Sequence, residues 1–174
     1  TETLAGSGVI SARGGVGPVV NEEDGGGGGG GRIALYSTTN KYVGLVRAHG
    51  GIGFQAGGAG SVYWHALPAQ RGTVVYDNAG LTNSLTTWTG PNDRSQLVLT
   101  NGTLLELLGG GVLAATERIT IATNSTLLCR ATNVTALVAE AWQGSGVTIT
   151  SATLRVEVGG LITANGQGYA GTVT

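Results

Sequence analysis

Hydrophobic and polar residues alternate along much of the chain. The alternation is most regular in LVL at 97–99, ITI at 119–121, VTIT at 147–150 and LRVEV at 154–158. A period of two is typical of β-strands with one buried face. The nearest candidate for a helix, TLLELLGGGVLAATERI at 103–119, is interrupted by three consecutive glycines, which a helix tolerates poorly. We interpret it as two short strands joined by a turn, and the pattern predicts an all-β chain.

Two short motifs recur. The first reads glycine, apolar, Ile or Val, any residue, Ala, any residue, glycine, and it occurs at 8–14, 44–50 and 160–166. The second is a glycine followed by alternating residues: GRIALY at 31, GSVYWH at 60, GTVVYD at 72, GTLLEL at 102 and GTVT at 171. A glycine at a strand boundary supplies the positive φ or the close approach that a sharp corner requires. Short strands with such corners predict stacked coils, in which each strand pairs with its copies above and below.

The expected fold is therefore a parallel β-helix, a solenoid with glycine-rich corners and a polyglycine insertion. The alternative is a β-sandwich or jelly roll, which hairpin turns such as DNAG at 77–80 and TNGT at 100–103 would favour. Residues 1–174 are expected to form one solenoid segment, glycine-rich over 1–80 and regularly alternating over 81–174. Because the chain starts at Thr1 and ends in GTVT, we expect a fragment or one module of a longer protein.

Composition and charge exclude several classes of protein. The 33 glycines and 11% charged residues differ from an average cytosolic enzyme, whereas 41% hydrophobic residues suffice for a core. The net charge is −1 and the basic residues are scattered, so no nucleic-acid partner is expected. No apolar run approaches the roughly 18 residues of a membrane-spanning helix, so membrane insertion is not expected. The single cysteine, Cys129, is expected to be a buried, unreactive thiol.

A longer series of motifs resembles a known class of repeat. GGGGGGGRIALYS at 25–37, GLVRAHGGIGFQAGGAGSVY at 44–63 and GTVVYDNAG at 72–80 follow one another. Together they are similar to the glycine-rich repeat modules of very large bacterial cell-surface proteins, and comparable stretches occur in plant and algal extracellular proteins. The resemblance covers residues 6–80 and returns at 159–174. It implies a β-helical, adhesin-like stalk with a structural or adhesive role at the cell surface, and it carries over no catalytic residue.

The acidic and polyglycine stretch NEEDGGGGGGG at 21–31 allows several interpretations. A phosphate-binding loop requires a terminal Gly-Lys-Ser or Gly-Lys-Thr, but this tract continues into Arg-Ile. Calcium binding is a second hypothesis, although the spacing matches no established calcium loop and a solvated acidic loop is favoured over it. The candidate calcium ligands are Asn21, Glu22, Glu23 and Asp24. We expect the glycines at 25–31 to lie ordered against neighbouring rungs or a neighbouring subunit, and we expect no other cofactor or metal.

No catalytic residue is expected, so the chain is interpreted as a non-enzyme. Polysaccharide-cleaving β-helices need carboxylates grouped on one face. The glutamates that follow the glycine-rich part lie singly on separate predicted strands: Glu106, Glu117, Glu140 and Glu157. The chain has no GxSxG motif, and His49 and His65 have no metal-type partners nearby in the sequence.

Aromatic side chains are the candidate contact residues. Flat rings displayed in a row stack on sugars, and outward aromatics equally form contacts between protomers. Tyr63 and Trp64 are neighbours on a predicted strand, so they must point to opposite faces. Packing or assembly is favoured over sugar binding. The candidates for sugar or subunit contact are Trp64, Trp88 and Trp142.

Three sequons are candidate glycosylation sites, at Asn101, Asn124 and Asn133. They agree with an extracellular location if the protein comes from a eukaryote with secretory export, and they carry no meaning in a bacterium.

The expected function is that of a non-enzymatic extracellular or cell-surface structural protein: a stalk, filament subunit or adhesin segment. Uncapped coils leave strand edges at both ends, so we expect self-association into a filament or a longer array. One alternative is a surface carbohydrate-binding module, whose partners would be cell-surface glycans. The other is a β-helical polysaccharide-degrading enzyme.

Overall fold

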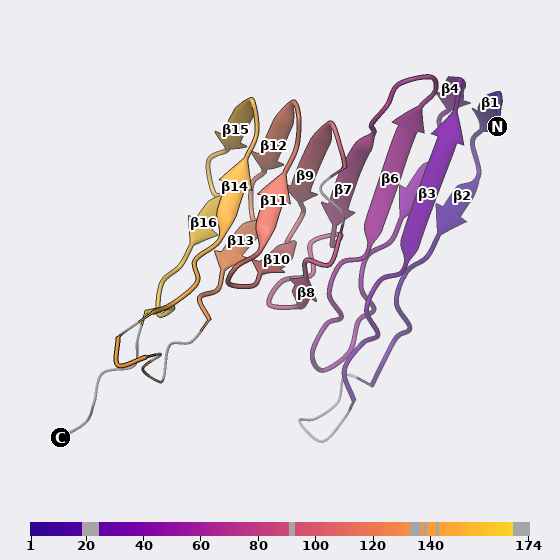
Figure 1. Cartoon of the computed structure of the whole chain (residues 1–174). Coiled ribbons are helices and arrows are strands. Elements are labelled where there is room, and N and C mark those ends of the chain that lie inside the picture. The colour runs from indigo at the N-terminus through magenta and orange to yellow at the C-terminus, as the bar shows by residue number, and fades with distance from the viewer. Residues whose placement is uncertain (19–24, 91–92, 133–136, 138, 142, 169–174) are drawn as a thin grey trace.

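The computed structural model describes residues 1–18, 25–90, 93–132, 137, 139–141 and 143–168. This described part contains sixteen β-strands and no helix, which confirms the predicted all-β class. It accordingly has no helix with the length and apolarity needed to cross a membrane. Figure 1 shows the strands lying side by side, with the N-terminus and β1 at one end of the stack and β15 and β16 at the other.

The first six strands form what we call the N-terminal block. Each of its first three strands pairs in parallel with the strand three places later in the chain. The pairing sets Val9 against Leu45 and Arg32 against Ser61, so the recurring motifs at 8 and 44, and those at 31 and 60, lie directly beside each other. The strands are β1 (Thr3–Gly6), β2 (Val9–Ser11), β3 (Arg32–Ser37), β4 (Thr39–Tyr42), β5 (Leu45–Arg47) and β6 (Ser61–Ala66).

The remaining ten strands form the C-terminal block. Here too, strands stack in parallel on strands from neighbouring layers, in sheets that include β16-β13-β10-β8 and β11-β14. The third copy of the first motif, at 160–166, lies in this block as β16 and pairs with β13, apart from the other two copies. The strands are β7 (Thr73–Asp77), β8 (Leu85–Thr87), β9 (Gln96–Thr100), β10 (Leu104–Leu107), β11 (Val112–Ala114), β12 (Arg118–Ile121), β13 (Thr126–Cys129), β14 (Thr148–Thr150), β15 (Thr153–Val156) and β16 (Leu161–Thr163).

One six-stranded sheet, in the order β15-β12-β9-β7-β6-β3, joins the two blocks. All its neighbours are parallel except β6 and β7, which pair antiparallel across the connection at 67–72. The chain therefore reverses direction once inside this sheet. The motif GTVVYD at 72, which the sequence groups with GSVYWH at 60, enters the sheet in the opposite direction.

The reversal places the interiors of the two blocks on opposite faces of the shared sheet. In the β6–β7 register, Val62 lies opposite Val75 and Tyr63 lies opposite Val74. Paired residues share a face and consecutive residues alternate, so Val62 and Val74 face opposite ways. Val74 packs on the core of the C-terminal block, whereas the buried Val62 faces a hollow lined by residues of β5.

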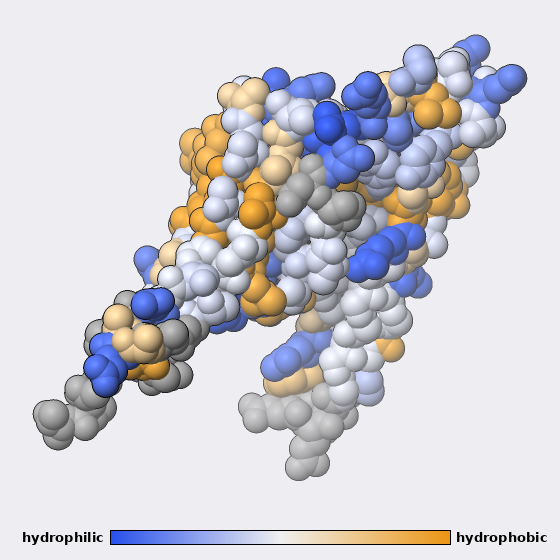
Figure 2. Space-filling view, in the orientation of Figure 1, coloured by the Kyte–Doolittle hydropathy of each residue, from blue (hydrophilic) through white to orange (hydrophobic). Residues whose placement is uncertain are grey.

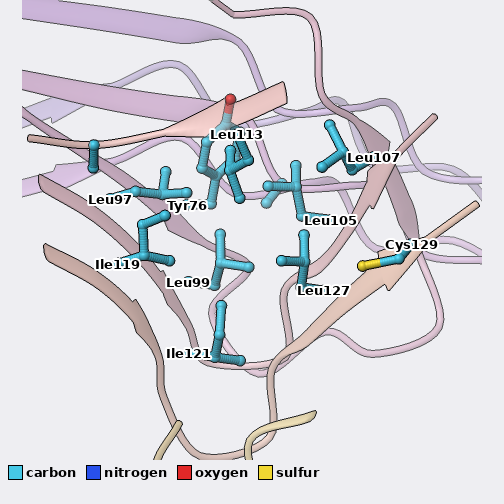
Figure 3. Close-up of a cluster of buried hydrophobic side chains, with 12 residues drawn as sticks. Tyr76, Leu97, Leu99, Leu105, Leu107, Leu113, Ile119, Ile121, Leu127 and Cys129 are labelled. Carbon is cyan, nitrogen blue, oxygen red and sulfur yellow. The ribbon is translucent and has the colours of Figure 1, made fainter. Parts of the chain in front are cut away.

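The core of the C-terminal block is a set of aliphatic ladders (Figure 3). Leu97 and Ile119 are register partners on β9 and β12, and Leu99 and Ile121 follow two residues later on the same face. All four are fully buried, as is Leu127 on the facing sheet. Cys129 closes one side of this core as a buried free thiol, and burial raises its pKa. That location agrees with the expected unreactive cysteine.

The polyglycine tract is one of four extended segments that pack together without forming strands. We call these segments, residues 12–18, 25–31, 48–54 and 55–60, the glycine lattice. Hydrogen bonds link the second segment to the fourth at Gly27 N to Gln55 O (2.8 Å) and Gly30 N to Gly58 O (2.9 Å). The spacing of three residues in both partners is that of a polyproline II helix, which has three residues per turn.

Every neighbouring pair of segments in the glycine lattice shares such bonds. The first and third segments are joined by Gly14 N to His49 O (2.9 Å), and the second and third by Gly51 N to Gly28 O (2.8 Å). A Cβ on Gly14 or Gly51 would overlap the backbone of an adjacent segment. Residues 25–31 therefore pack against neighbouring segments of the same chain, which agrees with the expectation that they lie against neighbouring rungs. The absence of side chains permits this spacing, because only glycine brings backbones so close.

The glycine lattice is docked on the C-terminal block by a buried asparagine. Asn78, which is 0% exposed, follows β7 in the DNAG sequence. Its Oδ1 accepts a hydrogen bond from Gly50 N (2.9 Å), and its Nδ2 donates to Gly57 O (3.2 Å) and Leu81 O (2.9 Å). One side chain thus holds two lattice segments and the corner that follows β7.

The turns that suggested hairpins are corners between sheets. After β9, Asn101 and Gly102 have φ of 51° and 83°, and the next strand, β10, belongs to a different sheet. After β12 and β15 the same place is taken by Asn124 (φ 59°) and Gly159 (φ 80°). These turns therefore do not favour the sandwich or jelly-roll alternative. Asparagine and glycine recur at the corners because they adopt the left-handed conformation most readily.

The corresponding corner after β7 holds an alanine in that conformation. Ala79 is exposed and has φ of 53°. We expect Ala79→Gly to raise the free energy of unfolding by about 0.5 to 1 kcal/mol, because glycine relieves the left-handed strain. Ala152→Gly is the control, because Ala152 is exposed and is not among the positive-φ residues of the described chain. This substitution should lower the free energy of unfolding by a similar amount. Urea denaturation measures both changes, and equal signs would contradict the prediction.

Candidate functional site

A cleft lies at the junction of the two blocks, where the covered face of the shared sheet changes from one side to the other. Its floor is the face of β3, β6 and β7 that carries Tyr36, Tyr63 and Tyr76, and its wall is the segment that follows β8, including Trp88 and Arg94. In the C-terminal block this face is covered by the other sheets, but beside β3 and β6 it is open. The cleft has a volume of about 420 Å³, within the usual range for small-ligand sites. We call it the aromatic cleft.

Aromatic rings line the cleft in edge-to-face contact. Tyr36 and Tyr63 have ring centroids 5.7 Å apart at 70°, and Tyr76 and Trp88 are 6.3 Å apart at 63°. Such geometry is favourable between aromatic rings. Tyr36 is 47% exposed, so it offers the most accessible apolar surface of the cleft.

Tyr63 is fixed in place by a short chain of hydrogen bonds. Its hydroxyl oxygen accepts from Gly72 N at 3.0 Å and lies 3.4 Å from His65 Nδ1. His65 Nε2 lies 2.6 Å from Ala69 O, a carbonyl that can only accept. Nε2 therefore carries a proton, and in the tautomer that is protonated at Nε2 alone, Nδ1 can accept from the tyrosine hydroxyl. These contacts fix the orientation of the Tyr63 ring.

Arg94 is the most unusual residue of the cleft. It is 1% exposed, its guanidinium lies 4.0 Å from the centroid of the Trp88 ring, and its buried Nη1 has no hydrogen-bond partner. Burial lowers the pKa of Arg94 to about 10, while the nearby Tyr76 and Asp93 oppose this shift. The side chain is charged at neutral pH. Cation–π contact with Trp88 stabilises it in part, but leaves a donor unsatisfied.

The charge of the cleft is predominantly positive. Arg32 donates from Nη2 to Thr89 Oγ1 at 3.1 Å, and neither Arg32 nor Arg94 forms an ion pair within the described residues. Asp93 is the one carboxylate among the described lining residues, and Arg71 Nε binds its Oδ1 at 2.6 Å. The two guanidinium groups thus lack an ion-pair partner among the described residues.

The structure separates the three candidate tryptophans. Trp88 lies in the aromatic cleft, whereas Trp64 faces the other side of the sheet, where it lines a hollow of about 300 Å³ with residues of β5. Tyr63 and Trp64 therefore point to opposite faces, as predicted. Trp142 lies outside the described residues. Trp64 and Trp88 do not form a row, because they lie on different faces of the sheet.

The calcium hypothesis falls on residues that the structure does not describe. Asn21, Glu22, Glu23 and Asp24 all lie outside the described ranges. Within those ranges, no group of three or more His, Cys, Asp or Glu side chains is placed to hold a metal ion.

Two of the three sequon asparagines lie at corners. Asn101 and Asn124 are exposed and have positive φ, while Asn133 lies outside the described residues. Asn101 Nδ2 donates to Asp77 Oδ2 at 2.9 Å, and the hydroxyl of the buried Thr103 donates to backbone carbonyls. Both side chains of this sequon therefore have structural partners, and the asparagine–glycine sequence serves the corner itself.

Sequence reasoning missed the two arginines that define the charge of the cleft. Arg32 is part of the strand motif GRIALY, which indicates no site, and Arg94 belongs to none of the motifs. The strand period does place Arg32 on the same face as Tyr36, but nothing local indicates that residue 94 returns to this face from a distant segment.

Comparison with known proteins gives no relative: no protein-family model, curated protein or solved structure matches the chain.

Proposed function

We propose that the chain is a structural segment of an extended extracellular or cell-surface protein, with a parallel β-helix as its architecture. Each coil of this solenoid would comprise three short strands that stack on those of the next coil. The proposal is supported by the strand pairs, of which ten are parallel and one, β6–β7, is antiparallel. It is also supported by the fully buried aliphatic ladders between layers.

One observation supports the structural role: the first strands of the described chain lie at one end of the stack and the last strands at the other. Figure 1 places β1 and the N-terminus at one end and β15 and β16 at the other. Units with opposite ends can be joined into a long array without folding back. The resemblance of residues 6–80 to glycine-rich repeats of surface proteins supports the same role and location.

The end formed by β15 and β16 favours growth of such an array. Leu154, Val156, Val158 and Leu161 are exposed there, Val158 by 94%. Figure 2 shows apolar side chains, in orange, gathered over this end. The outer edge of β15 has no partner among the described strands, and a free edge with apolar neighbours favours strand addition. We propose that a further unit of the same kind packs on this end, because GLITANG at 160 repeats the motif of GVISARG at 8.

Tandem copies test the spacer role. Six strands at a spacing of about 4.8 Å span about 30 Å, so each added copy should lengthen the particle by about that amount. Small-angle X-ray scattering of one, two and three copies gives the maximum dimension. An increment that shrinks with each copy, as in a collapsed globule, would contradict the proposal.

Association of a single unit is expected to depend on the exposed β15 edge. Leu154→Lys should lower self-association in sedimentation velocity experiments at high protein concentration, because a lysine on an edge strand opposes pairing. Leu108→Lys is the matched control, because Leu108 is equally exposed (48% against 47%) but lies after β10. Equal self-association of both variants would show that the β15 edge takes no part in the assembly.

A further inference from the structure

We propose that the aromatic cleft binds a saccharide unit that carries a carboxylate, with Arg94 and Arg32 holding the carboxylate and Tyr36 and Tyr63 contacting the sugar ring. This site is independent of the spacer role, since it needs only one folded unit.

The first argument is the buried, unpaired guanidinium of Arg94. A charged group that is removed from water without a full set of partners destabilises the fold. Stacking on Trp88 accounts for the position of the side chain, but leaves Nη1 without an acceptor. A ligand oxygen in the cleft would supply that acceptor.

The second argument is the convergence of two cations. Arg94 and Arg32 both line the aromatic cleft, Arg94 on its wall and Arg32 on its floor. In agreement with this placement, both guanidinium groups oppose the rise in the pKa of Tyr76 that burial causes. The only described carboxylate of the lining, that of Asp93, is bound to Arg71. A planar carboxylate matches the fork of N–H donors on a guanidinium.

The third argument is the surface that surrounds the two cations. Tyr36 and Tyr63 offer apolar ring surface, and Ser61 and Thr89 add hydroxyl groups to the lining. A small inorganic anion would leave the rings without a contact, and a neutral sugar would leave the guanidinium groups unpaired. A ring with both hydroxyls and a carboxylate uses all these groups, and a cleft of about 420 Å³ accommodates a small ligand of this kind.

The first experiment compares charged and neutral forms of the same sugar. Oligomers of glucuronic, galacturonic and mannuronic acid are titrated into the full chain by isothermal calorimetry, each beside its methyl ester. We expect at least one acid to bind about tenfold or more tightly than its ester, because the ester loses the charge-assisted hydrogen bonds. Absence of binding by all three acids, or equal binding of acid and ester, would overturn the proposal.

The second experiment uses variants. Arg94→Met keeps a long side chain over Trp88 but removes the charge, and Arg32→Gln changes an exposed residue of the floor. Each should weaken binding of the acid about tenfold or more. Arg118→Gln, on an exposed arginine of β12 outside the cleft, is the control and should bind as the unmodified chain.

Thermal unfolding separates this assignment from a purely structural role of Arg94. A buried cation that awaits a ligand destabilises the free protein, so Arg94→Met should leave the melting temperature unchanged or raise it. A lower melting temperature combined with unchanged binding in Arg32→Gln would show that Arg94 is structural and would overturn the proposal. If Arg94→Met fails to fold, Arg32→Gln and Tyr36→Ala, both at exposed positions, decide the question by their affinity.

Discussion

Gly30→Ala is expected to lower the free energy of unfolding by about 3 kcal/mol or more, whereas Gly29→Ala, one residue earlier, should change it by less than about 1 kcal/mol. A Cβ on Gly30 would overlap the carbonyl oxygen of Ala48 and approach Gly60 N at 2.5 Å. Gly30 also donates to Gly58 O, so the backbone cannot move away without losing that bond. A Cβ on Gly29 meets only Gly58 O, at 3.9 Å.

Urea denaturation of the two alanine variants measures this difference, and the pair is matched in sequence, chemistry and location. Hydrogen exchange gives an independent measurement: the amide of Gly30 should be protected in the unmodified chain and should exchange faster in Gly30→Ala at neighbouring lattice positions. Equal destabilisation by both substitutions, or rapid exchange throughout 25–31 in the unmodified chain, would mean that the glycine lattice is not a packed element.

Asn78→Ala is the second substitution with a large expected effect, a loss of about 3 kcal/mol in the free energy of unfolding. The change removes the acceptor for Gly50 N and the donor for Gly57 O and Leu81 O. These backbone groups lie at a buried junction, where each unsatisfied group costs about 1 to 3 kcal/mol.

Two further variants show whether the hydrogen bonds of Asn78 are responsible. Asn78→Asp retains an acceptor for Gly50 N but loses the Nδ2 donor, so it should also destabilise the fold. Asn165→Ala is the control, because Asn165 is exposed and its side chain forms none of the hydrogen bonds described here; it should change stability by less than about 0.5 kcal/mol. Chemical denaturation midpoints compare all three, and a similar small change in each would contradict the anchoring role of Asn78.

Local patterns predicted the elements of this chain well. Strict alternation located strands such as β9 and β12, and the three glycines after β10 were correctly interpreted as a turn, because Leu108 to Gly111 separates β10 from β11. The motif at 8 pairs in register with the motif at 44, and the motif at 31 with that at 60. Because the two motifs of each pair have the same internal spacing, their equivalent residues lie side by side.

Long-range features were not accessible from the same patterns. Alternation has no direction, so nothing in GTVVYD at 72 distinguishes a parallel from an antiparallel neighbour, and the reversal between β6 and β7 could not be read from it. The threefold spacing of the glycine lattice is hidden in a run that consists almost wholly of glycine. Arg94 enters the cleft from a segment that is distant in sequence from Tyr36 and Tyr63, so only the fold brings these groups together.

The reversal between β6 and β7 has a consequence for any array of these units. Since β3 and β6 run one way and β7, β9, β12 and β15 run the other, a unit related by simple translation would meet β15 with an antiparallel β3. The face of the sheet that is covered by the other sheets would then change twice in each unit. Each change would leave an open cleft in the side of the rod, at regular intervals. Each open cleft on one side would be an aromatic cleft, repeated about every 30 Å. Weak sites at a fixed spacing on a stiff rod bind a polymeric partner with high avidity.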